Sequence, residues 1–71
     1  MIELKVQDLS PGDEYTQDHG DTWWKVESIV QDHGAAAMRI NATCVGSQVA
    51  GIDVGSYESG PYDHDDLVVV R

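Results

Sequence analysis

Apolar residues recur at every second position along much of this chain, in short runs that turn-forming residues separate. The clearest run places Ala36, Met38, Ile40, Ala42 and Cys44 on one face of an extended segment. Successive side chains of a β-strand point to opposite faces, so this period is typical of strands that bury one face. We find no convincing segment with the 3.6-residue period of a helix. The pattern therefore predicts an all-β fold.

Six segments carry this strand signal. They span residues 2–7, 14–17, 23–31, 36–44, 48–54 and 67–70. Short strands joined by tight turns are typical of small antiparallel barrels and of sandwiches. A chain of 71 residues has room for one domain, which we expect to cover residues 1–71. We expect a small antiparallel barrel, SH3-like, with five to six short strands.

One strand needs an irregularity to keep its apolar residues together. Trp24 and Val26 share a face, whereas Ile29 is out of phase with them. An extra residue in one strand shifts the alternation by one position, which is what a β-bulge does. A bulge near Glu27 and Ser28 is therefore predicted, and it would return Ile29 to the core side.

Turn signals separate the predicted strands. Proline followed by glycine, at 11–12, fits the two central positions of a type II turn. The tetrapeptide Gln-Asp-His-Gly occurs at 17–20 and at 31–34. Its Asp and Gly predict hairpin turns, rather than a metal chelate or a duplicated unit. A further turn is expected at Gly-Ser 46–47.

The last part of the chain departs from the alternation. Residues 55–66 lack an apolar period and are rich in turn formers, so we expect a long loop. Residues 67–70 are apolar on both faces, which indicates a strand that is central or that seals the barrel.

Size and cysteine content bear on stability and association. A domain of 71 residues buries a smaller share of its surface than a larger one, so its stability is marginal. Cys44 is the single cysteine, and no disulfide within the chain is available to it. A homo-oligomer is therefore one open alternative.

The charge balance excludes some classes of partner. Thirteen acidic residues stand against four basic ones, for a formal net charge of -9. Such a surface repels phosphate backbones and anionic lipids, so we expect no direct binding to nucleic acid or membranes. The partner is expected to be a protein, with a basic surface as the complementary choice. The first residues lack the apolar core of a signal peptide, which predicts a cytoplasmic location, bacterial or in an infected host cell.

Three segments of the sequence have counterparts in a group of small proteins. They are VQDLSPGDEY, TWWKVESIV and the final LVVVR. The chain resembles tiny β-barrel proteins encoded by actinobacteria and their phages, which pair a DL-x-PGD opening with a W-x-V strand and a final V-x-V-R. The resemblance covers mainly residues 6–30 and 67–71. It implies a β-barrel fold and a phage context, and it transfers no activity.

The sequence predicts neither catalysis nor a cofactor. Cys44 falls on the inward face of its strand, where it would pack as a small apolar residue. The serines lie mainly in turns, and no glycine-rich phosphate loop precedes a helix. Residues 63–66, Asp-His-Asp-Asp, together with Asp13 or Asp32 could supply oxygen ligands for Ca²⁺. Without EF-hand spacing we predict a solvated loop and no metal site.

Aromatic residues beside carboxylates are the predicted binding surface. With Trp24 in the core, Trp23 should face outward, or else cover the open end of the barrel. Tyr57 and Tyr62 flank Gly-Pro at 60–61, a rigid corner that would present them, and exposed aromatic residues dominate many interfaces. The predicted partner-binding residues are Trp23, Tyr57, Tyr62, Asp63, Asp65 and Asp66.

Two classes of function follow from these features. The leading hypothesis is a small acidic protein-interaction module, a phage accessory protein that binds a host or viral protein. In a sharper form, its carboxylates imitate the phosphates of nucleic acid and occupy a basic groove. The alternative is a virion or assembly component that acts by oligomerising through the apolar strand 67–70.

Overall fold

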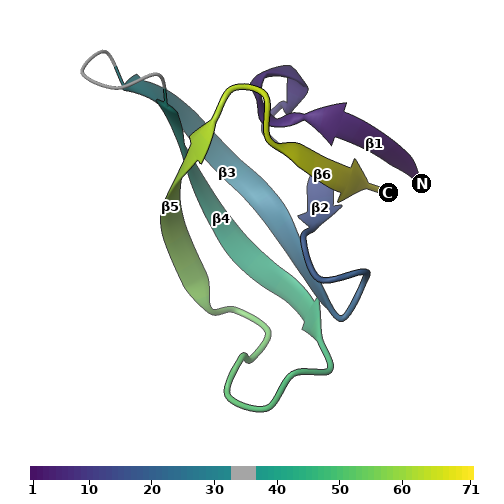
Figure 1. Cartoon of the computed structure of the whole chain (residues 1–71). Helices are drawn as coiled ribbons and strands as arrows, with labels where there is room; N and C mark the ends of the chain where they lie inside the picture. Colours follow the sequence, from purple (N-terminus) through teal and green to yellow (C-terminus); the bar gives the residue numbers. More distant parts are fainter. Residues whose placement is uncertain (33–36) are drawn as a thin grey trace.

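Six antiparallel strands form one sheet in the computed structural model, which describes residues 1–32 and 37–71 (Figure 1). The strands are β1 (Ile2–Lys5), β2 (Glu14–Thr16), β3 (Thr22–Asp32), β4 (Ala37–Ser47), β5 (Tyr57–Asp63) and β6 (Leu67–Val70). A single 3₁₀ turn, η1 (Val6–Asp8), follows β1 and ends the predicted first strand early. The all-β prediction is confirmed. The part of the chain that the structure describes contains no helix long and apolar enough to cross a membrane.

The sheet has the strand order β1-β6-β2-β3-β4-β5. In Figure 1, β1, β6 and β2 lie on one side of the long β3–β4 ribbon, and β5 lies on the other. Within the described residues β1 and β5 do not pair with each other, so the sheet is open. The strand count agrees with the prediction, whereas the SH3-like barrel stays a prediction.

The hydrophobic core lies against one face of this sheet. Its buried residues are Val6, Leu9, Tyr15, Val26, Ile40, Ala42, Val68 and Val70. Trp24 and Met38 are partly buried and pack against them. Cys44 is also buried, as its place on the inward face predicts. The alternation along β4 therefore decides which of its residues enter the core.

The predicted bulge in β3 is present. Val26 pairs with Ala42 and Ser28 pairs with Asn41, so Glu27 is the extra residue. Beyond it, Ile29 packs against the core, as we expected. Val26 and Ile29 lie three positions apart and share a face because the bulge leaves Glu27 without a partner in the ladder.

The Pro-Gly turn before β2 also forms as predicted. The amide of Asp13 donates to the carbonyl of Ser10 at 3.0 Å, and Gly12 has a φ of 93°. A positive φ at the second central position is the requirement of a type II turn, and glycine meets it without steric cost. The carboxylate of Asp13 also accepts from the amide of Ser10 at 2.8 Å, which holds the turn.

The predicted order of strand and loop is wrong between residues 46 and 63. β4 continues through Ser47, so no turn forms at 46–47, and residues 48–54 form no strand. Gly51 within this segment and Gly55 just after it have φ values of 89° and 95°, which an extended strand does not allow. The strand is instead β5, inside the predicted loop 55–66.

β5 lacks an apolar period because it is an edge strand. Its residues alternate between exposed and half-buried, and its middle is Ser-Gly-Pro. Main-chain pairing with β4 runs from Thr43 opposite Tyr57 to Ala37 opposite Asp63. Proline is tolerated on an edge strand, where its missing amide donor faces away from the ladder.

β6 is central, as its apolar sequence predicts. It pairs with β1 on one side and with β2 on the other. All four of its residues pair with β1, whereas β2 pairs with Val69 and Val70. Oligomerisation through residues 67–70 stays a prediction. The turn predicted at 31–34 lies partly outside the described residues. Ala36, which belongs to the predicted inward face of 36–44, lies wholly outside them.

Candidate partner-binding site

The face of the sheet opposite the core carries a second, smaller group of apolar residues. Tyr15 and Val70 pair across β2 and β6 and belong to the core. Their neighbours Thr16 and Val69 also pair, and they point to the other face because side chains alternate along a strand. We call this the outer face. Trp23, which lies outside the core cluster, contributes to it.

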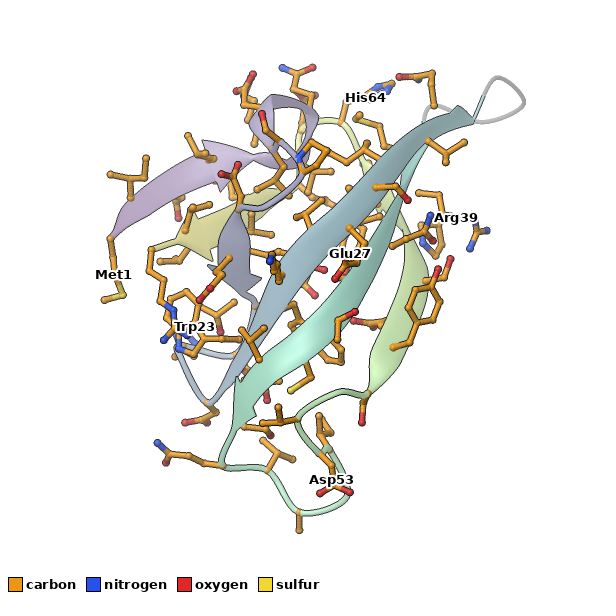
Figure 2. All side chains as sticks on the ribbon, turned by 180° about the vertical axis from the view of Figure 1, so that it is seen from behind. Met1, Trp23, Glu27, Arg39, Asp53 and His64 are labelled. Atoms are coloured by element: carbon orange, nitrogen blue, oxygen red, sulfur yellow. The ribbon has the colours of Figure 1, made fainter. Side chains whose placement is uncertain are left out.

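A hollow of about 380 Å³ opens on the outer face. It is lined by Met1, Thr16, His19, Gly20, Trp23 and Val69. Figure 2 shows Met1 and Trp23 on the same side of the molecule. The lining is mainly apolar, and His19 and Thr16 are its residues with polar side chains. Concave apolar sites with a few polar groups are the usual form of binding sites.

Trp23 is held in place rather than exposed. Only 9% of its surface is accessible, so the expectation of an exposed indole is wrong. The guanidinium of Arg71 lies over its ring, and Arg71 also pairs with Glu14, Nε to Oε1, at 2.8 Å. A Cβ at Gly20 would lie 3.8 Å from the indole Nε1, so the β2–β3 turn also borders the ring. The indole therefore presents only part of its surface to the hollow.

The rim of the hollow is built by the turn between β2 and β3. The amide of Asp21 donates to the carbonyl of Asp18 at 3.3 Å, and His19 and Gly20 have φ values of 60° and 93°. The predicted hairpin turn is therefore present, and its two successive positive φ values are typical of type I′. The turn places the exposed His19 at the rim.

Hydrogen bonds to one carboxylate hold this turn. Asp18 Oδ1 accepts from the hydroxyl of Thr16 and from the amide of Thr22, both at 2.8 Å. The Thr16 hydroxyl oxygen also accepts from the amide of Gly20 at 3.0 Å. Desolvation raises the pKa of Asp18, but the bonds from Thr16 and Thr22 outweigh it and lower that pKa overall. Asp18 is thus a structural acid.

The two predicted tyrosines do not share a site. Tyr57 is 64% exposed, as predicted. Tyr62 is half-buried, packs against the core, and donates its hydroxyl to Gln17 Oε1 at 2.9 Å. The two lie an odd number of residues apart on β5 and so point to opposite faces. The predicted Gly-Pro corner is absent because residues 60–61 lie within the strand.

Tyr15, which the sequence places in a predicted strand and in no site, has a pKa that burial and its neighbour Tyr62 raise. Tyr15 is almost fully buried in the core. Desolvation raises the pKa of its hydroxyl, and Tyr62 and Glu58 raise it further. Desolvation likewise raises the pKa of Tyr62. Both groups are therefore held in their neutral form.

The three predicted aspartates lie where β5 ends and the turn to β6 follows: Asp63 is the last residue of β5, and Asp65 and Asp66 come after it. The turn is closed by the amide of Asp66, which donates to the carbonyl of Asp63 at 3.1 Å. Asp66 Oδ2 in return accepts from the amide of Asp63 at 3.0 Å. Asp65 lies 3.5 Å from Lys5, and all three aspartates are exposed. The predicted site residues thus occupy four separate places: Trp23 the hollow, Tyr57 the exposed start of β5, Tyr62 the core side of β5, and the three aspartates the region of this turn.

Charges in the described residues are largely unneutralised. Two ion pairs form there, Lys5 with Asp65 and Arg71 with Glu14. Beside the hollow, Glu3 lies opposite Val69 in the ladder and Asp21 follows Gly20, and both are exposed. Within residues 1–32 and 37–71, no three His, Cys, Asp or Glu side chains converge as metal ligands would. The site therefore combines an apolar floor with an acidic border.

No family model, curated protein or solved structure matches this chain. The resemblance to actinobacterial and actinophage proteins accordingly stays a prediction. Sequence reasoning named Trp23 but missed Met1, His19 and Val69 as lining residues. They are far apart in the chain, and the pairing of β6 with both β1 and β2 brings them together.

Proposed function

We propose that this protein is a small acidic protein-interaction module that receives an apolar side chain of its partner in the Trp23 hollow. The observation that carries the proposal is the hollow itself, with its floor of Trp23, Val69 and Met1. Aromatic and aliphatic pockets of this kind take the anchor residues of interfaces. Strand pairing holds Val69 and the Arg71 contact holds Trp23, so little ordering of these two residues would be needed on binding. Met1 lies before β1 and is 88% exposed.

The border of the hollow indicates the chemistry of the partner. Glu3 and Asp21 are exposed beside it, and the chain as a whole carries a formal charge of -9. A matching ligand has one large apolar side chain flanked by lysine or arginine. Complementary charge would speed association and exclude acidic competitors. A basic protein surface with a protruding apolar residue fits this description.

The proposal is tested with a bead library of random heptapeptides. We expect the protein to enrich peptides that carry one large apolar residue between basic residues. Val69→Phe would fill the hollow from β6 and should weaken binding of a selected peptide at least ten-fold. Val30→Phe is the matched control, because Val30 lies on β3 outside the lining, is half exposed, and should leave binding unchanged. Binding should weaken moderately as salt rises.

Two results would contradict the hollow as the binding site. One is a library screen with no apolar enrichment. The other is equal binding by the wild type and by Val69→Phe. Purely basic peptides, with affinity that falls steeply with salt and ignores Val69, would instead support a mimic of nucleic-acid phosphates.

A further inference from the structure

β1 leaves one side of its backbone open. Among the described residues its single ladder partner is β6, and it lies outermost in Figure 1. Just beyond the strand, the amide of Val6 donates to the carbonyl of Asp66 at 2.8 Å. Residues that bond across an antiparallel ladder alternate with residues that do not. Ile2 and Leu4 therefore bond to β6, and Glu3 and Lys5 direct their backbone groups to the open edge.

The two edges of the sheet differ in how they are protected. β5 contains Pro61, which lacks an amide donor, and its charged residues, Glu58 and Asp63, are both acidic. Proline and like charges on an edge strand discourage pairing with another chain. β1 has no proline, and its charged residues are one acid and one base. Of the two edges, β1 is the one suited to pairing.

The charges of β1 are complementary to a second copy of the same strand. We propose that two copies of this chain associate through antiparallel pairing of β1 with β1, centred on Leu4. In this register Glu3 of each copy lies opposite Lys5 of the other, so the two-fold symmetry gives two such pairs. Both residues have outward backbone groups, so each such pair can form two main-chain hydrogen bonds. A shift in either direction would oppose Glu3 to Glu3 or Lys5 to Lys5.

Apolar surface supports the same register. Ile2 is 60% exposed, although it shares the face of β1 that carries Leu4. In the proposed pair, Ile2 of each copy lies diagonally beside Leu4 of the other, within contact range for long side chains. The interface is a single strand pair, smaller than standard interfaces, so we expect a reversible dimer. The dimer uses Glu3, which also borders the Trp23 hollow, but neither Trp23 nor Val69. Dimerisation of Glu3→Pro and peptide binding by Val69→Phe therefore test the two proposals separately.

The test is sedimentation equilibrium of the whole chain over a wide concentration range, at moderate salt to screen the net charge. We expect a monomer–dimer equilibrium for the wild type. Glu3→Lys would place two lysines opposite each other and should weaken the dimer at least ten-fold. The double variant Glu3→Lys/Lys5→Glu restores opposite charges across the interface and should recover dimerisation. Far-UV circular dichroism reports whether each variant keeps its fold.

A second variant tests the main-chain pairing of β1 with β1 without changing the charge pattern to a repulsive one. Glu3→Pro removes an outward amide and leaves the bonds of β1 to β6 in place, so it should give a folded monomer. Glu58→Lys, on the opposite edge, is the control and should leave dimerisation unchanged. A wild type that stays monomeric at the highest concentration would overturn the proposal. So would a dimer that ignores Glu3→Lys and Glu3→Pro, or one that the double variant fails to restore.

Discussion

The guanidinium of Arg71 lies 4.3 Å from the centroid of the Trp23 ring. Its Nε also donates to Glu14 Oε1 at 2.8 Å, which fixes the plane of the guanidinium above the indole. This contact explains how a tryptophan outside the main core becomes almost fully buried. It also fixes the indole that forms the floor of the hollow.

Replacing Arg71 with alanine should uncover the Trp23 ring. Cation–π contacts and exposed ion pairs are each worth about 0.5–1 kcal/mol, so we expect a loss of about 1 kcal/mol in the free energy of unfolding. Urea unfolding measures the loss, and acrylamide quenching of tryptophan fluorescence should increase. Arg39→Ala is the control, since Arg39 is exposed and contacts Ser59 Oγ at 3.3 Å. Equal effects from the two substitutions would contradict a special role for Arg71.

Deleting Glu27 should leave the core intact. Without this extra residue Val26 and Ile29 lie two positions apart, so a regular strand keeps them on one face and keeps their pairs with Ala42 and Ile40. Deleting Lys25, in the regularly paired part of β3, would instead put Trp24 and Val26 on opposite faces. Because small domains have only about 5 kcal/mol of stability, this second variant should fail to unfold cooperatively. Thermal unfolding followed by near-UV circular dichroism distinguishes the two deletions, and loss of cooperativity on deleting Glu27 would contradict the bulge.

The turn before β2 predicts a contrast between two glycines. Gly12 has a φ of 93°, whereas Gly46 lies in β4, and a Cβ added at either position would have open space for 4 Å around it. Gly12→Ala should therefore cost about 1 kcal/mol through backbone strain alone. Gly46→Ala should be neutral or slightly stabilising, because it restricts the unfolded chain. Similar chemical-denaturation midpoints for both variants would refute the type II turn.

Burial of Tyr15 should make the fold sensitive to alkaline pH. The pKa of its hydroxyl is raised by desolvation above the ordinary value of 10.0, so the folded state keeps the proton more tightly than the unfolded state. The associated stability is complete below pH 10 and is lost as the pH rises above it. Tyr15→Phe should flatten this decline in urea unfolding followed by far-UV circular dichroism. Tyr57→Phe, at an exposed position, should leave the decline unchanged.

Several local features could be predicted because neighbouring residues decide them. The Pro-Gly turn, the Asp-His-Gly turn at 18–20 and the bulge at Glu27 depend on φ preferences and on alternation within a few positions. The same holds for the inward face of β4, where Ile40, Ala42 and Cys44 follow one another at every second residue. Short-range steric and solvation effects are enough to specify such elements.

The errors lie where pairing overrides local preference. Residues 48–54 alternate like a strand, yet β4 extends to Ser47 and Gly55 bonds back to Cys44, its amide to that carbonyl at 2.9 Å. β5 has a poor strand sequence and forms because β4 offers a long unpaired backbone edge. An edge strand can gain its stability from main-chain hydrogen bonds, and these form whether the side chains are polar or apolar.

The alternation of apolar residues by itself determined that this protein is all-β, and the turn-forming residues determined where the chain reverses direction before β2 and before β3. Tertiary structure alone decided that Trp23 is covered and that a hollow forms beside it. It also decided that β1 rather than β6 is an open edge. The reason is that these features join segments from opposite ends of the chain, and strand pairing depends on the packing of the whole sheet.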